Sequence, residues 1–333
     1  MSAAAPRGWR RSLATASAAV CVAAVCVAAA GVSGPAAAQG APFAYVPNEG
    51  SGTVSVIDTG SDQVVGEIRI GRKPRGLAAS RDGTRLFVSD QPASRLVVVD
   101  LASRQPVGEV ALGASPEGVY AAPDGRLLAV ASEEANSVVF VDVAAAREAF
   151  SVKVAGKNPE HAVFSPDGRW VYASAEDDDT VEVVDVAARA QAARIKVGER
   201  PRGIGFLPDG SRAYVAAEND DHVYVIDTTT RAVLARVPAG KRCNGIAVHP
   251  SGERVYVSNG GDGDVAVLDV RSNTVVARVP TGRRPWNMAI TPDGRKLYVA
   301  NGRSNSVSVI DTTTNTKLRD VAVGELPWGV AIR

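Results

Sequence analysis

The chain repeats itself about every 42 residues along most of its length, and this period restricts the possible folds more than any other feature. In each repeat an aspartate ends a short run of mainly β-branched residues, as at residues 307–311. The successive intervals are 42 residues, except for one of 43. These aspartates are Asp58, Asp100, Asp142, Asp185, Asp227, Asp269 and Asp311. Because a repeat array forms one architecture whatever its length, we predict a single domain of seven units.

Each repeat contains four short apolar runs with turn residues between them, and none has the period of a helix. In the last complete repeat these runs cover residues 286–291, 296–300, 306–310 and 317–323. The pair Asp293-Gly294 separates the first two runs, and glycine there supplies the positive φ of a tight turn. The recurring aspartates follow the third run, where an aspartate side chain can bond nearby backbone amides. We therefore interpret them as turn formers and not as catalytic acids.

The two ends of the array indicate that it closes into a ring. The first repeat starts at its second run, residues 43–46, and the chain ends with one extra leading run within residues 326–333. A C-terminal strand would complete the three N-terminal strands and leave no open sheet edge at the seam. We therefore predict an all-β fold, a seven-bladed β-propeller of four-stranded antiparallel blades with this three-plus-one closure. A solenoid is the alternative.

The N-terminal segment has the pattern of a secretory signal peptide. Three arginines, Arg7, Arg10 and Arg11, precede an apolar run at residues 13–30, and three alanines follow at 36–38. We predict that residues 1–38 are a signal peptide and residues 39–333 the propeller, in a periplasmic or secreted protein without a membrane span after cleavage. An uncleaved membrane anchor is the alternative, because 18 apolar residues can just span a bilayer.

Composition narrows the function classes. Without the three leader arginines, the chain has 34 basic and 36 acidic residues, so no net positive charge favours a nucleic-acid partner. Cys243 is the one cysteine beyond the leader, it takes the place of a loop proline, and no intrachain disulfide is possible there. No Cys-x-x-Cys-His motif for covalent heme, no Gly-rich phosphate loop and no Gly-x-Ser-x-Gly motif occurs. We expect a monomer.

Two motifs carry a family resemblance. Residues 297–301, Leu-Tyr-Val-Ala-Asn, and residues 256–259, Tyr-Val-Ser-Asn, resemble the signature of the YVTN family of β-propeller repeats. Ser132 and Ala175 replace the asparagine of this motif, so an asparagine-based site would be incomplete in two repeats. Residues 282–286 and 326–330 resemble a bacterial subgroup associated with pyrroloquinoline quinone-dependent alcohol catabolism. The family resemblance implies that the leading strand of each blade is innermost, which would bring two sets of loops together at one channel mouth.

In most repeats a proline precedes the leading run. The residue directly after this proline, or after the residue that replaces it, differs from repeat to repeat, whereas its neighbours recur. In addition, His161 and Asn287 replace a recurring glycine. Since functional residues concentrate on loops at such a mouth, all these residues are candidate ligand-binding residues. The alternative is that the channel mouth is solvent-exposed and that any polar residue is tolerated at these positions without a function. The candidates are Arg75, Glu117, Glu160, His161, Arg202, Asn244, Trp286, Asn287 and Trp328.

Two pairs suggest more specific chemistry. Glu160 and His161 could act as an acid–base pair, because histidine titrates near neutral pH. The alternative is a histidine that is hydrogen-bonded within its strand. Trp286 and Trp328 could form a stacking platform for a ligand or a packed seam between blades.

Charged loops suggest a calcium site, because hard cations bind clustered carboxylates. The loops between the second and third strands are acidic in three successive repeats, and those before the first strand are basic, which predicts a basic inner rim beside an acidic sector. Solvated surface charge is the alternative. The candidate ligands are Glu176, Asp177, Asp178, Glu218 and Asp220.

From these observations we expect an exported, non-enzymatic β-propeller that binds a protein or a small ligand at the channel mouth. An accessory or enzymatic component of quinone-dependent alcohol oxidation, with pyrroloquinoline quinone as cofactor, is one alternative. A lactonase-like hydrolase is the other, since propellers host many unrelated chemistries.

Overall fold

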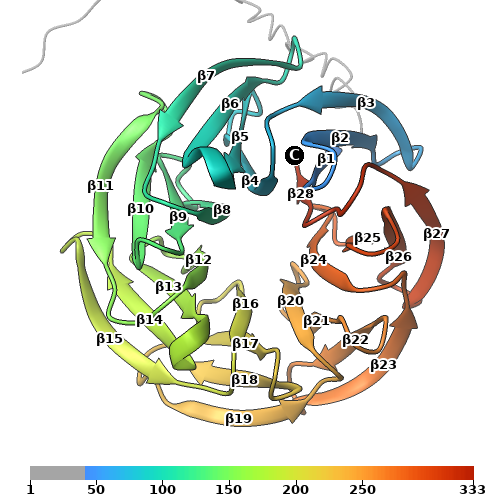
Figure 1. Cartoon of the computed structure of the whole chain (residues 1–333). Helices are drawn as coiled ribbons and strands as arrows, with labels where there is room; N and C mark the ends of the chain where they lie inside the picture. The colour runs from blue at the N-terminus through green and yellow to red at the C-terminus, as the bar shows by residue number, and fades with distance from the viewer. Residues whose placement is uncertain (1–41) are drawn as a thin grey trace, which may run out of the picture. The chain divides into compact units, whose positions relative to one another are not determined.

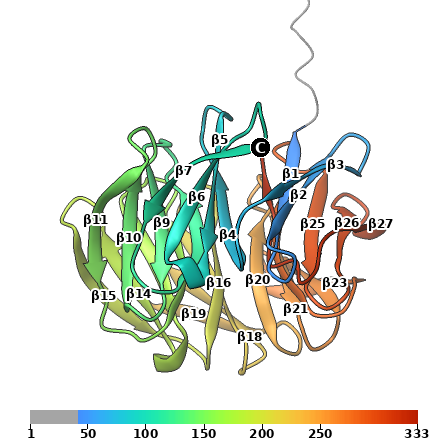
Figure 2. The same cartoon turned by 45° about the horizontal axis from the view of Figure 1, so that its top comes forward.

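A computed structural model describes residues 42–333, and the predicted signal peptide at residues 1–38 lies outside this range. The described residues form seven four-stranded antiparallel sheets arranged in a ring around a central channel (Figures 1 and 2). The predicted seven-bladed β-propeller is confirmed.

Each blade uses consecutive strands, except at the seam where the ring closes. Blade 1 holds β28 (Ala331–Ile332), β1 (Phe43–Asn48), β2 (Thr53–Asp58) and β3 (Gln63–Arg69). Blade 2 holds β4 (Pro74–Ala79), β5 (Arg85–Asp90), β6 (Arg95–Asp100) and β7 (Gln105–Ala111). Blade 3 holds β8 (Pro116–Ala121), β9 (Leu127–Ser132), β10 (Ser137–Asp142) and β11 (Arg147–Lys153). Blade 4 holds β12 (Pro159–Phe164), β13 (Trp170–Ala175), β14 (Thr180–Asp185) and β15 (Ala190–Lys196).

The remaining blades follow the same order. Blade 5 holds β16 (Pro201–Phe206), β17 (Arg212–Ala217), β18 (His222–Asp227) and β19 (Val233–Pro238). Blade 6 holds β20 (Cys243–Val248), β21 (Arg254–Asn259), β22 (Asp264–Asp269) and β23 (Thr274–Pro280). Blade 7 holds β24 (Pro285–Ile290), β25 (Lys296–Asn301), β26 (Ser306–Asp311) and β27 (Thr316–Ala322). Two 3-10 turns, η1 (Gln91–Ala93) and η2 (Glu176–Asp178), are the helical elements of the described range. Within residues 42–333 no helix is long and apolar enough to cross a membrane.

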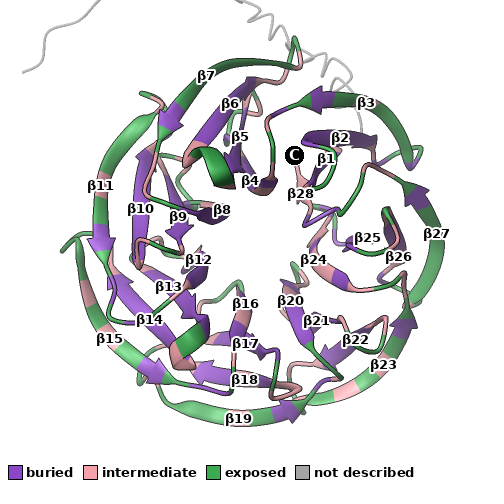
Figure 3. Cartoon of the chain, viewed as in Figure 1, coloured by how far each residue is buried: buried purple, intermediate pink, exposed green. Residues whose placement is uncertain are grey.

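The core lies between neighbouring blades. The second and third strands of each blade are buried on both faces, whereas the outermost strand is mostly exposed and has one buried residue near its end (Figure 3). A fully buried tyrosine recurs on the second strand of four successive blades, at Tyr172, Tyr214, Tyr256 and Tyr298. Tyr172 of blade 4, for example, packs in one cluster with Val215 of blade 5. Because each blade buries its face against the next one, the repeats stabilise one another around the ring.

The recurring aspartates form turns, as expected from the sequence. Asp58 Oδ1 accepts the backbone N–H of Ser61 at 2.8 Å, and Asp311 Oδ1 accepts that of Thr314 at 2.9 Å. These backbone hydrogen bonds hold the pKa of each carboxyl below its usual value. At the Asp-Gly turns, Gly294 has φ +76°, which confirms the need for glycine.

The C-terminal strand closes the ring, as predicted. In β28, Ala331 pairs with Tyr45 and Ile332 with Ala44 of β1. The N–H of Phe43 donates to the Arg333 carbonyl at 2.7 Å, and the N–H of Arg333 donates back at 2.9 Å. The last residues of the chain therefore complete the first blade.

Two recurring positions are structural. Asn301 is fully buried and donates to the hydroxyls of Ser306 and Ser308 at 3.1 and 2.9 Å, so this asparagine orders its own blade and not a binding site. Cys243 is also fully buried, and its thiol donates to the Ala217 carbonyl at 3.2 Å. Burial raises the pKa of Cys243 to about 12, so its thiol is inert.

Candidate functional site

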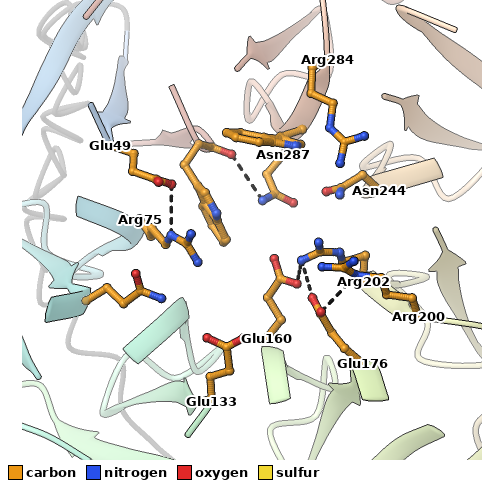
Figure 4. A pocket seen from close by; sticks show the side chains of 13 residues that line it. Glu49, Arg75, Glu133, Glu160, Glu176, Arg200, Arg202, Asn244, Arg284 and Asn287 are labelled. Atoms are coloured by element: carbon orange, nitrogen blue, oxygen red, sulfur yellow. Dashed lines mark hydrogen bonds and ion pairs between the residues drawn. The ribbon is translucent and has the colours of Figure 1, made fainter. Parts of the chain in front are cut away.

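A polar cavity of about 270 Å³ occupies one mouth of the central channel (Figure 4). It lies where the loops before the innermost strands meet the loops between the second and third strands, as the sequence predicted. Seven of the nine candidate ligand-binding residues line it. Glu117 and His161 do not, because both are fully buried behind its wall. The lining candidates are Arg75, Glu160, Arg202, Asn244, Trp286, Asn287 and Trp328.

A second recurring position at this cavity is the residue that directly follows the second strand of each blade. Sequence reasoning named two of its members, Glu176 and Glu218, only as candidate calcium ligands and missed the recurrence. Glutamate or glutamine occupies it in blades 1 to 5 and glycine in blades 6 and 7. The signal was visible in the sequence, since the position repeats at 42 or 43 residues and changes character only in the last two units. Its members are Glu49, Gln91, Glu133, Glu176, Glu218, Gly260 and Gly302. Arg200 and Arg284, from the loops before β16 and β24, were also missed as lining residues.

Arg202 on β16 is the centre of a buried ion network. Its guanidinium pairs with Glu160 and Glu176 of blade 4 and, at 2.8 Å, with Glu218 of its own blade. Figure 4 shows Arg202 between Glu160 and Glu176 at the edge of the cavity. Glu160 lies on β12, Glu176 in η2 and Glu218 directly after β17, so the network joins two blades at the channel.

Glu218 has no exposed surface, yet several arginines keep it charged. Its Oε1 accepts from Arg242 at 2.9 Å and from Arg284 at 2.7 Å, in addition to the Arg202 contact. Burial alone would raise the pKa of Glu218, but these guanidiniums outweigh it and hold the pKa at about 2.

Arg75 forms a second network across the channel from Arg202. Its Nε donates to Glu49 Oε2 at 3.1 Å and its Nη1 to Glu117 Oε1 at 2.6 Å. Glu117 is fully buried, and burial raises its pKa to about 7 despite the adjacent Arg75. Acids and bases therefore pair with each other at the mouth, so the charges that the sequence assigned to a basic rim and an acidic sector meet in shared networks.

Trp328 forms the floor of the cavity. Together with Arg75 and Asn287 it also lines a smaller cavity of about 80 Å³ further along the channel, so these three residues separate the two spaces. The N–H of Trp328 donates to the Pro47 carbonyl at 2.9 Å, and its indole stacks on His161. Trp286 instead lies against Gly302, where an added Cβ would come within 2.6 Å of the indole. The two indoles thus have different neighbours, and both line the mouth cavity.

The Glu160–His161 pair does not have the geometry of an acid–base catalyst. His161 has no exposed surface, its Nδ1 is hydrogen-bonded to the Tyr120 hydroxyl, and its Nε2 lies 4.0 Å from Glu160. Burial lowers the pKa of His161 to about 4, and Glu160 is engaged by Arg202. The alternative interpretation, a hydrogen-bonded histidine within a strand, agrees with the structure.

The acidic loop residues do not assemble a calcium site. Glu176 and Glu218 point into the arginine networks, Asp177 accepts from Asn158, Asp178 pairs with Arg194, and Asp220 pairs with Arg236. Within residues 42–333 no group of three or more potential ligands is placed to hold a metal ion. The candidate metal ligands are therefore engaged by arginines or, for Asp177, by the Asn158 amide.

Comparisons with known proteins agree with the fold. Residues 185–325 match the family described as "Lactonase, 7-bladed beta-propeller", and residues 28–206, more than half of the chain, match the family described as "Cytochrome D1 heme domain". The chain belongs to the cytochrome D1 heme domain family. Its repeats are YVTN-type propeller repeats, as the motifs indicated. No curated protein matches this member of the family in sequence.

Several solved structures share the propeller of this cytochrome D1 heme domain family member. A Kuenenia stuttgartiensis hydrazine synthase chain is 26% identical, with a TM-score of 0.75 over 80% of this chain and 92% of that one. A functionally unknown protein from Desulfotomaculum acetoxidans is 19% identical, with a TM-score of 0.77 over 87% and 98%. A candidate 6-phosphogluconolactonase from Bacteroides uniformis is 19% identical, with a TM-score of 0.75 over 89% and 100%. The last two likenesses show the fold alone.

The family name implies a heme, but the mouth residues do not fit one. Protein ligands to heme iron are histidine, cysteine, methionine or tyrosine, and none of the 13 residues that line the cavity is of these types. His161 lies beneath Trp328 without exposed surface. The lining is also dominated by ion pairs, which are a poor match for an apolar macrocycle. This member of the cytochrome D1 heme domain family therefore lacks a heme-binding arrangement at its channel mouth.

Proposed function

We propose that this propeller is a non-enzymatic binding protein whose mouth cavity takes a small organic acid. The observation that carries the proposal is the side of the cavity formed by blades 6 and 7. There the side-chain amide of Asn244 has no hydrogen bond within residues 42–333 and faces the cavity, close to Arg284 and Asn287 (Figure 4). Amides and a guanidinium are suitable donors for a carboxylate.

The size and remaining walls of the cavity define the ligand further. A volume of about 270 Å³ suits a compact molecule, near the lower limit of small-molecule sites. The indole of Trp286 lines the same side and offers a flat apolar surface for the body of the ligand. Such a ligand would place its carboxylate near Arg284 and its apolar part on Trp286.

The charged groups at the mouth support binding more than catalysis. Glu160 and Glu176 are ion-paired with Arg202, and Glu49 with Arg75, so these carboxylates are engaged by cations of the protein itself. His161 is inaccessible. None of these groups is available as a general base near neutral pH.

Lactone hydrolysis is a second candidate, supported by the partial match to the lactonase family and by Glu133. Glu133 lines the cavity, accepts the Ser115 hydroxyl at 2.9 Å and has no ion pair among the described residues. In a lactonase it would be the general base that activates water. Lactone turnover that disappears in Glu133→Gln would favour this candidate over simple binding.

The cellular setting is also part of the proposal. We infer from residues 1–38 that the protein is exported to the periplasm or beyond, where it would meet its ligand or a protein partner. Pyrroloquinoline quinone is a planar polycarboxylate and belongs among the ligands to test, in line with a role beside quinone-dependent alcohol oxidation. Calcium belongs in the same assays as an additive.

Isothermal titration of the purified protein with small organic acids, lactones and pyrroloquinoline quinone tests the proposal. We expect one saturable ligand, bound about tenfold or more weakly by Asn244→Ala and by Trp286→Ala. Trp170→Ala is the matched control, since Trp170 is half-buried away from the mouth between Arg169 and Arg231. Equal affinity of all three variants would place the ligand elsewhere and reject the proposal.

A further inference from the structure

A second cavity, of about 710 Å³, lies beside the channel mouth between the loops of blades 6 and 7. Its walls are the β21–β22 loop at residues 260–263, the loop before β24 at residues 281–284, and residues 303–304 of the β25–β26 loop. Arg284 lines both this cavity and the mouth cavity, so the two are adjacent. We refer to it as the arginine cavity.

The arginine cavity has an excess of positive charge. Four arginines line it, Arg242, Arg283, Arg284 and Arg303, against one acid, Asp262. Arg242 and Arg284 share the buried Glu218. Neither Arg283 nor Arg303 has an acidic partner within residues 42–333, and the Arg283 guanidinium donates to the Arg303 carbonyl at 2.9 Å. Two guanidiniums are therefore available to an anion.

The two glycines at the recurring mouth position add no acid to this cavity. In blades 4 and 5 the acid at this position pairs with the arginine of the following loop, as Glu176 does with Arg200 and Glu218 with Arg242. In blade 6 the position is Gly260, and Arg284 of the next loop reaches back to Glu218 at 2.7 Å. A Cβ at Gly260 would lie 3.2 Å from Arg284 Cδ, so a glutamate there would crowd this arginine. Blades 6 and 7 therefore supply no acid of their own at this position, and Arg284 depends on Glu218 of blade 5.

Hydroxyl groups complete the lining. Ser304 Oγ accepts the N–H of Arg283 at 2.7 Å, which leaves its own O–H free to donate. Asp262 Oδ2 accepts the N–H of Lys241 at 2.8 Å and forms no ion pair with the arginines. The lining contains no aromatic residue, so it lacks the stacking surface with which proteins bind single-stranded nucleic acid.

We propose that the arginine cavity binds a phosphate monoester of a small molecule. The planar guanidinium group of arginine matches the oxygens of phosphate in geometry and charge. Arg283 and Arg303, together with the Ser304 hydroxyl, would supply hydrogen-bond donors from two loops. A dianion suits two unneutralised guanidiniums better than a single carboxylate does. The volume lies within the range of small-molecule sites, which favours a metabolite over an acidic protein segment.

Isothermal titration of the whole protein at low ionic strength with glycerol phosphate and inorganic phosphate tests this site. We expect saturable binding that is weakened about tenfold or more in Arg283→Gln and in Arg303→Gln. Both side chains are exposed, so these changes leave the fold intact. Asp262→Asn removes the one repelling charge and should strengthen binding severalfold. Arg271→Gln, an exposed arginine in the β22–β23 turn, is the matched charge control and should change nothing.

The outcomes separate this site from the mouth cavity. Trp286→Ala should leave glycerol phosphate affinity unchanged, because Trp286 does not line the arginine cavity. Absence of saturable binding of both probes below about 10 mM would overturn the proposal. So would unchanged affinity in Arg283→Gln and Arg303→Gln, or tighter binding of an acidic peptide or citrate than of glycerol phosphate.

Discussion

The indole of Trp328 stacks on the imidazole of His161, with ring centroids 5.5 Å apart and an angle of 23° between the rings. Trp328 belongs to the closing segment at the seam of blades 7 and 1, whereas His161 lies on β12 of blade 4, on the far side of the channel (Figure 1). The contact therefore crosses the channel. Through this contact the C-terminal segment that closes the ring also forms the floor of the mouth cavity.

Replacing Trp328 by alanine should merge the two channel cavities and destabilise the fold. Trp328 is 7% exposed, and removal of a buried tryptophan costs about 3–5 kcal/mol of unfolding free energy. Urea denaturation measures this loss. Trp170→Ala, which removes a half-buried indole, should cost clearly less. Equal losses in the two variants would show that Trp328 does not support the channel.

The sequence predicted the ring and the turns because both depend on local patterns. Asp311 bonds to residues two and three positions away, and a 42-residue period needs only repetition to be recognised. The mouth position after the loop proline was predicted for the same reason. Local patterns suffice for features that are complete within one repeat.

The charge pairing and the buried histidine depend on contacts between distant repeats. Arg202 acquires its partners from two blades, and Arg284 reaches 66 residues back to Glu218. His161 appeared to be a candidate catalyst because nothing near it in sequence shows that Trp328 covers it. Such contacts depend on the radius of the ring and on the direction of each side chain. Neither of these can be inferred from the sequence of a single repeat.

Opposite pH effects on stability are expected from two buried groups. His161 is neutral in the fold, and its pKa is lowered from 6.5 to about 4. Its contribution to the free energy of unfolding is therefore complete above pH 6.5 and is lost as pH falls towards 4. Glu117 has its pKa raised from 4.5 to about 7, so its contribution is complete below pH 4.5 and is lost as pH rises through 7. Each change is about 3 kcal/mol. Between pH 4.5 and 6.5 the two effects largely cancel.

Single substitutions should separate these two effects. In Glu117→Gln the His161 contribution remains, so the unfolding free energy should rise between pH 4.5 and 6.5 relative to the wild type. In His161→Phe the Glu117 contribution remains, so the unfolding free energy should fall between pH 4.5 and 6.5 relative to the wild type. Urea denaturation at several pH values measures both slopes. Parallel pH profiles for the wild type and both variants would contradict the assigned pKa directions.

Deleting residues 327–333 should abolish cooperative folding. The deletion removes β28 and Trp328, and it exposes the backbone of β1 along a sheet edge. Calorimetry should show a broad transition of reduced enthalpy. A synthetic peptide of residues 325–333, added in excess, should restore part of the lost melting temperature by binding to the folded state. A truncated chain that melts like the full one would mean that β28 is not needed for closure.

Arg202→Gln should destabilise the protein by about 3–5 kcal/mol at pH 7, because it leaves the buried Glu160 without a cation and removes one of the arginines that pair with Glu176 and Glu218. Arg202 is 13% exposed, so solvent cannot replace the lost charge. The deficit relative to the wild type should shrink as pH falls from 7 to 5, since the carboxylates can then take up protons. Arg295→Gln removes an arginine that is 82% exposed and 4.0 Å from Asp293, and it should have little effect. Urea denaturation of the two variants at pH 7 and pH 5 checks both statements. A similar small effect of both substitutions would show that the network at the mouth contributes no more than a surface ion pair.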